Sequence, residues 1–154
     1  MRREYHSTTE AQTFELGVRL GALLRPGHFV GLIGQLGAGK TAFSRGVASG
    51  AGVPLDDVSS PTYSLVQTYK GRVTLHHLDL YRLATEADLF SIGYFELIDD
   101  AAAMLVEWVD RVASATPSDA LVVTASAVSE TERLFRADAT GAVSERLLHA
   151  WLPG

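Results

Sequence analysis

Apolar and small residues recur three or four positions apart between Phe14 and Leu24. This spacing predicts a helix that turns one face toward the core. The sequence STTE at residues 7–10 has the Ser-x-x-Glu spacing of a capping box, which places the start of this helix at Ser7. The dipeptide Pro26-Gly27 predicts its end, because neither residue continues a helix well.

Short apolar runs then alternate with amphipathic segments. Strands are predicted over residues 28–33, 64–69, 72–80, 103–108, 120–127 and 133–139. Helices are predicted over residues 40–51, 85–91, 95–99 and 144–151, with Thr85 as an N-cap. The second and third strands meet at Lys70-Gly71 and form a hairpin. Strands that alternate with helices, interrupted by a hairpin, predict an α/β layered fold with a mixed sheet.

Composition narrows the classes of protein. A chain of 154 residues, 47% apolar and 20% charged, is predicted to fold as one domain over residues 1–154. A net charge of −5 and a pI near 5.5 argue against broad electrostatic binding to nucleic acid. The lack of cysteine excludes disulfides and thiolate metal sites. No apolar run has the length of a signal peptide core or a membrane span, so we expect a cytoplasmic protein.

The sequence GQLGAGKT at residues 34–41 fits the phosphate-binding pattern G-x-x-x-x-G-K-[ST]. Glycines let successive N–H groups face a phosphate, and the following helix adds the positive end of its dipole. Lys40 would neutralise phosphate charge, and Thr41 would offer its hydroxyl to Mg²⁺. The alternative is a glycine-rich turn without a ligand, which the preceding strand and following helix disfavour. The predicted nucleotide contacts in this segment are Gly34, Leu36, Gly37, Ala38, Gly39, Lys40, Thr41 and Ala42.

Two carboxylates are candidates to bind magnesium. Glu107 ends an apolar strand and Asp79 lies near the end of another, which are the positions from which acidic residues reach a bound nucleotide. The alternatives are a surface ion pair between Asp79 and Arg82 and an exposed strand-end charge at Glu107. Asp99 and Asp100 precede their strand and are predicted to be solvated turn residues.

Two further pairs are harder to interpret. His76 and His77 are adjacent in a predicted strand and therefore point to opposite faces, so they suit a shared metal poorly, although one of them could line the site. Arg133 and Arg136 lie on a late strand and are expected to face solvent. The sequence therefore shows no obvious arginine finger.

Three functional classes fit these residues: a nucleotide hydrolase that switches state, a small-molecule kinase, and an ATP-gated binding module. The chain lacks the N/T-K-x-D sequence typical of guanine specificity, which favours adenine. A kinase also needs polar or basic residues that hold a second substrate, and no convincing set is present. The kinase is therefore the least favoured class.

Four motifs resemble one family, the TsaE family of small bacterial ATPases needed for threonylcarbamoyladenosine modification of tRNA. They are GQLGAGKT (34–41), SSPTYSLV (59–66), HHLDLYRL (76–83) and LVEW (105–108). Residues 13–30 also look like the family's N-terminal segment, and the resemblance fades beyond Trp108. Gln35, Ala42 and Val109 depart from residues that are usual in the family, and none of the three is assigned to the chemistry.

The resemblance implies a P-loop NTPase fold of three layers whose mixed sheet includes an antiparallel hairpin. It implies Mg²⁺-dependent hydrolysis of ATP to ADP that is slow in isolation and tied to the TsaD and TsaB proteins. TsaD would transfer the threonylcarbamoyl group to adenosine 37 of tRNA, so the ATPase would meet tRNA only indirectly. Its ATP cycle would reset the transferase between turnovers.

The resemblance also implies roles for single residues. Lys40 and Thr41 match the phosphate and magnesium positions, and Asp79 and Glu107 match carboxylates near the magnesium ion. Thr62 resembles a switch threonine that follows the γ-phosphate. The residues that match the segment near the base are Thr9, Glu10 and Thr13.

Overall fold

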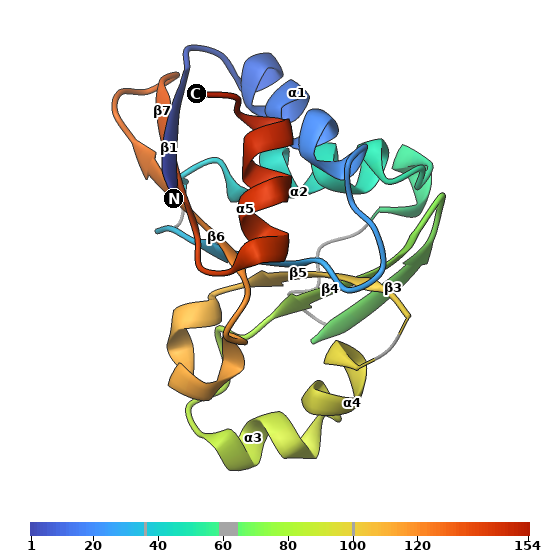
Figure 1. The fold of residues 1–154 in the computed structure, drawn as a ribbon. Helices are drawn as coiled ribbons and strands as arrows, with labels where there is room; N and C mark the ends of the chain where they lie inside the picture. The colour runs from blue at the N-terminus through green and yellow to red at the C-terminus, as the bar shows by residue number, and fades with distance from the viewer. Residues whose placement is uncertain (36, 59–64, 100) are drawn as a thin grey trace.

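A mixed sheet runs through the middle of the protein (Figure 1). The computed structural model describes residues 1–35, 37–58, 65–99 and 101–154. Within them, the strands are β1 (Arg2–Ser7), β2 (Phe29–Ile33), β3 (Val66–Lys70), β4 (Thr74–Asp79), β5 (Ala103–Glu107), β6 (Leu121–Ala127) and β7 (Arg133–Ala139). Their spatial order is β1-β7-β6-β2-β5-β4-β3. The four central strands β6, β2, β5 and β4 are parallel, and antiparallel pairs complete both edges.

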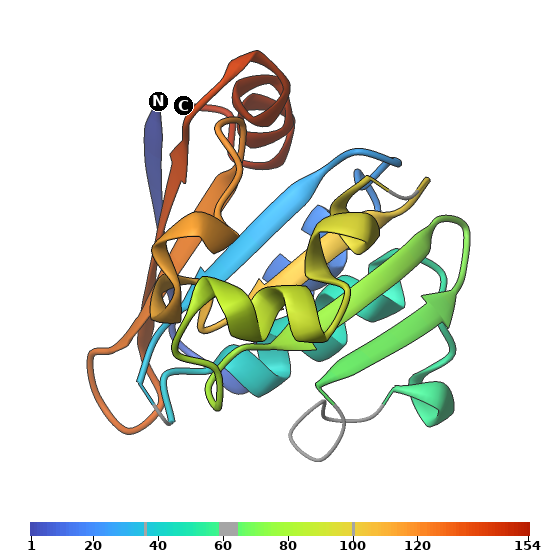
Figure 2. The same cartoon turned by 90° about the horizontal axis from the view of Figure 1, so that it is seen from below.

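Helices cover both faces of this sheet. The helices of one face are α1 (Glu10–Gly21), α2 (Lys40–Gly50) and α5 (Ala142–Trp151), and those of the other are α3 (Glu86–Ser91) and α4 (Tyr94–Ile98). Short 3₁₀ turns lie at η1 (Leu55–Asp57), η2 (Val109–Arg111) and η3 (Ala113–Ala115). In Figure 2, α3 and α4 lie in front of the sheet, with α1 and α2 behind it. The predicted three-layer arrangement and the antiparallel hairpin, formed by β3 and β4, are both present.

Alternating strand residues divide the core into two clusters. In β5, Ala103 and Leu105 pack with α1, α2 and α5, whereas Met104 and Val106 pack with α3 and α4. This alternation follows from the pleat, which sends successive side chains to opposite faces. Because both faces are covered, β5 is buried up to Val106 and becomes partly exposed only at Glu107. An acidic residue at this end therefore meets a partly solvated edge.

The N-terminal segment differs from the prediction. Residues 2–7 form an edge strand, β1, rather than an approach to a helix, and the helix begins only at Glu10. Thr9 is its N-cap and accepts a hydrogen bond from the backbone N–H of Gln12. The predicted capping box at Ser7 is wrong, because the Ser7 hydroxyl lies 2.7 Å from the Thr13 hydroxyl and is buried there.

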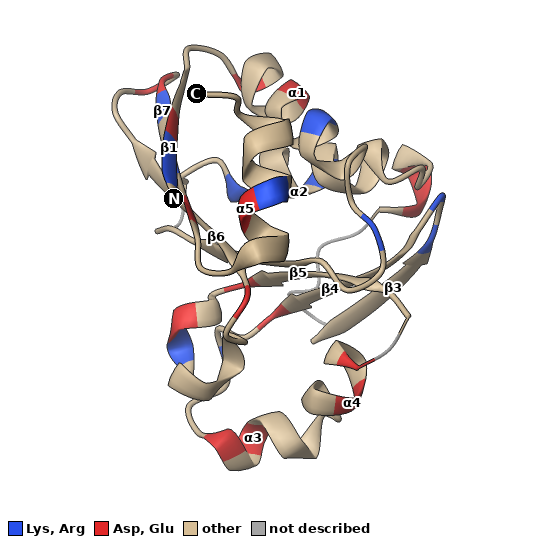
Figure 3. Cartoon of the chain, viewed as in Figure 1, with Lys and Arg blue, Asp and Glu red and all other residues tan. Residues whose placement is uncertain are grey.

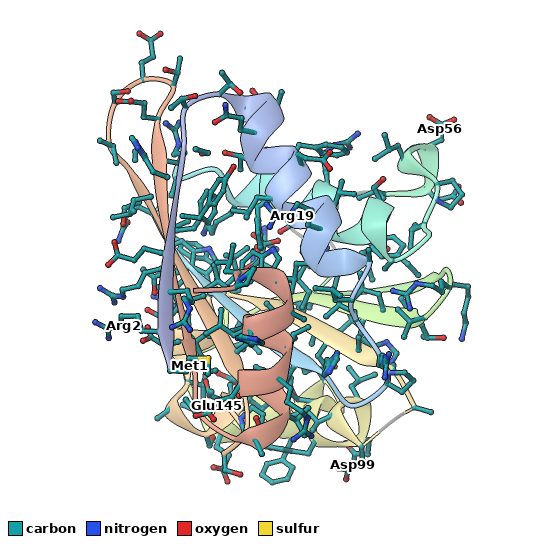
Figure 4. The ribbon with its side chains drawn as sticks, turned by 45° about the horizontal axis from the view of Figure 1, so that its top comes forward. Met1, Arg2, Arg19, Asp56, Asp99 and Glu145 are labelled. Carbon is teal, nitrogen blue, oxygen red and sulfur yellow. The ribbon has the colours of Figure 1, made fainter. Side chains whose placement is uncertain are left out.

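Polar contacts of Arg2 and Arg19, both labelled in Figure 4, hold the two ends of the chain. Arg2 binds Asp138 of β7 with an Nε to Oδ1 distance of 2.6 Å, and Arg19 of α1 donates to the carbonyl of Trp151.

On the layer of α3 and α4, Asp99 is exposed at the end of α4, as predicted. Asp100 lies outside the described residues. None of the helices in the described part of the chain combines the length and the hydrophobicity that a bilayer span requires.

Helices α1 and α2 touch backbone to backbone. Gly17 and Gly21 of α1 face Gly46 and Gly50 of α2, and a Cβ at any of these glycines would overlap the backbone of the other helix. Only glycine permits this separation, because it has no side chain to fill the gap. The contact fixes α2 relative to α1, and α2 is the helix that follows the predicted phosphate loop.

We therefore expect Gly46→Ala to lower the free energy of unfolding by at least about 3 kcal/mol, since the new methyl group meets the carbonyl oxygen of Phe14 rather than a movable side chain. Urea unfolding of both proteins measures the difference. The control is Gly27→Ala, which meets open space and costs only about 1 kcal/mol for its left-handed backbone. Equal losses in the two variants would contradict a tight helix contact.

Candidate nucleotide-binding site

A cavity of about 1090 Å³ opens where β4 and β5 end and α2 begins. It is lined by the first turn of α1, by residues 37 and 39–42, by the ends of β4 and β5, and by the turn between β6 and β7. Ligands of open parallel sheets bind at this edge, beyond the carboxyl ends of the strands. Gly37, residues 39–42 of the predicted phosphate segment, the two candidate carboxylates and His77 thus meet at one place.

The loop before α2 adopts the backbone that its glycines predict. Gly37 has φ of 81° and Gly39 has φ of 97°, both in the left-handed region that favours glycine. Gly39 is the N-cap of α2, and the first turn of this helix carries no acidic residue that would occupy its free N–H groups. Those N–H groups and the helix dipole therefore remain available to an anion. Leu36 lies outside the described residues.

Lys40 is a buried cation in the first turn of α2, with 8% of its surface exposed. Its Nζ lies 3.9 Å from the centroid of the Trp108 ring, within the range of a cation–π contact. Burial lowers the pKa of Lys40, while the nearby carboxylates of Glu107 and Asp79 act in the opposite direction. A bound phosphate would supply further negative charge and so stabilise the ammonium form.

Asp79 and Glu107 are direct partners in the parallel register of β4 and β5. Asp79 Oδ1 accepts a hydrogen bond of 2.9 Å from the backbone N–H of Tyr81. Burial raises the pKa of Asp79, and the negative charge of Glu107 adds to the increase. Among the described residues, no ion pair joins Asp79 to Arg82, so this alternative is wrong. Two adjacent carboxylates attract a cation, because each disfavours the charge of the other.

Glu107 is not the exposed strand-end charge of the alternative reading. Its side chain is only 13% exposed, and Oε2 lies 2.6 Å from Nε2 of His77. His77 lines the cavity, a position that the sequence left open for one of the two histidines. His76 points to the other face of β4, where its Nδ1 lies 2.9 Å from the Thr68 hydroxyl. The opposite orientations follow from the pleat of the strand.

Trp108 turns the chain sharply after β5. Its φ is 57°, which makes it the one non-glycine residue with a positive φ in the described part of the chain. The predicted strand included Trp108, but the strand ends at Glu107 and the 3₁₀ turn η2 begins at Val109. The turn brings the indole ring between Lys40 and Tyr81, whose ring centroid lies 5.0 Å away. A strained backbone of this kind persists only where surrounding contacts hold it, and it is often found at functional sites.

A family model described as threonylcarbamoyl adenosine biosynthesis protein TsaE matches residues 7–135. The chain belongs to the TsaE family. This family is involved in the biosynthesis of threonylcarbamoyladenosine in tRNA. The matched segment contains every residue that lines the cavity, whereas α5 lies outside it.

Individual relatives agree with the family match. The chain is 38% identical to the tRNA threonylcarbamoyladenosine biosynthesis protein TsaE of Treponema pallidum over 127 residues, which cover 82% of this chain and 93% of that protein. It is 30% identical to the protein of the same name from Bacillus subtilis, with 90% and 86% covered. The crystal structure of Bacillus subtilis YdiB superposes with a TM-score of 0.82 at 24% identity, covering 98% of this chain and 94% of YdiB. The fold is therefore the P-loop NTPase fold that the motifs predicted.

Some of the other predicted site residues line the cavity and some do not. Glu10 and Thr13 line the cavity, although the Thr13 hydroxyl is bound to Ser7, whereas Thr9 is an exposed cap that does not line it. Ala38 and Gly34 also do not line it. A Cβ on Gly34 would come 2.8 Å from the carbonyl oxygen of Ala125, so its glycine allows the loop to pass β6. Thr62 lies outside the described residues, and its switch role stays a prediction.

Arg133 was missed by the sequence argument, and the expectation that it faces solvent is wrong. It lines the cavity from the start of β7, and its Nη1 donates to the carbonyl oxygens of Ser129, Glu130 and Glu132. Its Cγ would lie 3.4 Å from a Cβ on Gly39. The alternation of inward and outward side chains along β7 could have revealed the inward position of Arg133, because this residue shares a face with buried Phe135 and Ala137. Arg136 lies on the opposite face and is exposed, as expected.

The raised pKa of Asp79 predicts a stability cost at neutral pH. A folded-state pKa above the ordinary value of an aspartate means that the ionised carboxylate destabilises the nucleotide-free fold above both values. We expect Asp79→Asn, whose carbonyl can still accept from Tyr81, to raise the free energy of unfolding at pH 7 by up to about 1 kcal/mol. The gain should vanish as the pH falls through the raised pKa, because the parent carboxyl is then neutral too.

Urea unfolding at pH 7 and at pH 3.5 measures both parts of this prediction. Asp99→Asn is the matched control, since Asp99 is exposed and precedes the start of β5, whereas Asp79 and Glu107 lie where β4 and β5 end. A loss of stability in Asp79→Asn at pH 7 would show that the ionised carboxylate is a net stabilising group.

Proposed function

We propose that this chain binds ATP together with Mg²⁺, hydrolyses it to ADP and phosphate, and thereby resets the TsaD–TsaB transferase complex in the cytoplasm. The observation that carries the proposal is the meeting of three features at one cavity. They are the left-handed glycine loop that opens α2, the buried cation Lys40, and the paired carboxylates Asp79 and Glu107. Together they suit a ligand that brings both phosphate groups and a divalent cation.

The donor set fits a magnesium ion carried by a nucleotide. Thr41 offers a hydroxyl oxygen, and Asp79 and Glu107 offer carboxylate oxygens, which are the ligands that Mg²⁺ prefers. Within the described residues, no group of three histidine, aspartate or glutamate side chains is arranged to hold a metal ion alone. This supports a metal ion that is bound jointly by the protein and by phosphate oxygens. Bound Mg²⁺ would supply positive charge next to the transferred phosphoryl group.

Hydrolysis then requires stabilisation of charge and placement of a water molecule. Lys40 and the free N–H groups of α2 stabilise negative charge on the phosphate oxygens as the bond to the leaving ADP lengthens. Asp79 and Glu107 provide oxygens for the metal ion and for orienting the attacking water. The water adds to the γ-phosphorus, ADP leaves, and the proton of the water passes to phosphate or solvent. Full activity would draw on the partner complex, since hydrolysis is expected to be slow in isolation.

The charge distribution supports an indirect role toward tRNA. Acidic residues lie on α3 and α4, the layer below the sheet in Figure 3, and the whole chain carries a net charge of −5. Direct binding of nucleic acid depends on Lys and Arg that neutralise phosphates. This layer is therefore a poor surface for tRNA, which supports contact through the transferase proteins.

We expect Lys40→Ala to reduce phosphate release by at least about a hundredfold, because it removes the cation beside the transferred group. The chain contains one other lysine, Lys70, which is exposed at the end of β3 and provides the matched control Lys70→Ala. Phosphate release is measured for the parent and both variants, with and without TsaD and TsaB. Turnover at the parental rate in Lys40→Ala would overturn the site.

Phosphate release, a pull-down with TsaD and TsaB, and a labelled-ATP assay against metabolites together separate the alternative functions. Stimulation of phosphate release by TsaD and TsaB supports the ATPase proposal. Nucleotide-dependent association with those proteins without stimulated turnover would instead identify an ATP-gated binding module. A phosphorylated metabolite formed from labelled ATP would identify a kinase.

Arg133 is expected to contribute to nucleotide affinity. Its Cγ and Cδ lie beside Gly39, and three carbonyl oxygens of the β6–β7 turn hold its guanidinium, so the positive charge is fixed at the cavity before a ligand arrives. We predict that Arg133→Ala weakens ADP binding about tenfold, the effect of one lost charge-assisted contact. Isothermal titration calorimetry measures the affinity, and Arg136→Ala on the opposite face of β7 is the control. Parental affinity in Arg133→Ala would exclude the contact.

A further inference from the structure

We propose that His77 is a positioning residue that orients the carboxylate of Glu107 for the magnesium ion. The inference rests on the proposed function of the cavity. His77 Nε2 lies 2.6 Å from Glu107 Oε2, and the two side chains are 4% and 13% exposed. This is a short hydrogen bond with little access to solvent, in which the imidazole N–H donates and the ionised carboxylate accepts.

The pairing of β4 with β5 produces this contact. His77 is opposite Leu105, and Glu107 is opposite Asp79, two residues further along both strands. All four side chains lie on the face that carries α2, so the histidine reaches the glutamate diagonally across the strand pair. The neighbouring His76 is equally buried but lies on the other face, where it meets Thr68.

The hydrogen bond from His77 gives the Glu107 carboxylate a fixed orientation and a hydrogen-bond partner, both of which its position otherwise lacks. A glutamate side chain has several rotatable bonds, and a largely buried carboxylate has few water molecules to bind it. The hydrogen bond holds one carboxylate oxygen and leaves the other to face a cation. Asp79 has an equivalent donor in the Tyr81 backbone N–H, which does not depend on the Tyr81 side chain. Glu107 instead depends on a side chain.

His77 therefore acts through Glu107 rather than on a ligand directly. Its Nε2 is engaged by the carboxylate, and in the described part of the chain it belongs to no cluster of three residues that could hold a metal ion. Groups that hydrogen-bond to a metal-binding carboxylate fix its orientation, and their loss commonly lowers metal affinity about 10- to 100-fold. The same range is expected here.

The test measures Mg²⁺ affinity separately from nucleotide affinity. Binding of a fluorescent ADP analogue is titrated first without Mg²⁺ and then as a function of Mg²⁺ concentration. We expect His77→Ala to weaken the apparent Mg²⁺ affinity about 10- to 100-fold while the metal-free ADP affinity stays within about twofold. His77→Gln, whose amide N–H can replace the imidazole N–H, should recover most of the loss.

His76→Ala and His76→Gln are the matched controls, because His76 is adjacent and equally buried but faces away from the cavity. Thermal unfolding confirms that each variant is folded. If His77→Ala does not fold, His77→Asn, whose shorter amide falls short of Glu107, replaces it in the comparison with His77→Gln. Mg²⁺ affinity that is unchanged at position 77, or reduced equally at position 76, would overturn the inference.

These outcomes are distinct from a failure of the proposed function. A parent protein that binds the ADP analogue without any effect of Mg²⁺ would refute magnesium binding at the cavity. A parent with clear Mg²⁺ dependence, combined with a normal His77→Ala variant, would refute only the role of His77.

Discussion

The parallel pairing of β2, β5 and β4 is the constraint on which the site depends. Parallel strands end at the same edge of a sheet, so their register decides which side chains of neighbouring strands lie next to each other at that edge. Glu107 pairs with both Leu32, just before the phosphate loop, and Asp79. A shift of one residue in β4 would turn Asp79 and His77 to the α3–α4 face and bring His76 and Leu78 to the cavity. The chemistry of the cavity is therefore set by a backbone register that the buried residues of β5 enforce.

Stability and function are opposed at this edge of the sheet. Burial disfavours the charges of Lys40 and Asp79, and Trp108 has a left-handed backbone that only surrounding contacts maintain. Each feature makes the nucleotide-free fold less stable than an unstrained, neutral alternative would be. A bound phosphate would relieve the cost of charge at Lys40, and a bound cation would relieve it at Asp79. The tight glycine contact between α1 and α2 supplies rigidity elsewhere. The site thus keeps its charges in place because the elements behind it cannot move apart.

The sequence predicted most of this arrangement where pattern and chemistry agreed. The buried strand before Glu107 and the glycine loop before Lys40 both have periodic or motif signatures, and the TsaE resemblance is confirmed by the family match. The edge strand β1 was missed because residues 2–7 carry almost no apolar pattern. Arg133 was misplaced because a charged residue on a strand suggests solvent, although its alternation with Phe135 pointed inward. Propensity alone also could not predict the turn at Trp108, which depends on its contacts with Lys40 and Tyr81.

Residues 59–64 lie outside the described chain, but both of their described neighbours are at the site. Val58 lines the cavity, and the carbonyl of Leu65 accepts a hydrogen bond from the backbone N–H of Asp79. On the far side of the hairpin, Arg72 donates to the carbonyl oxygens of Gly21 and Leu24 and ties the turn to α1. The β3–β4 hairpin is therefore held at both ends, and at one of them Leu65 binds the backbone of Asp79, a candidate magnesium ligand. The switch role of Thr62 rests on the TsaE resemblance and stays a prediction, because the flanking residues show only that Val58 and Leu65 lie at the site.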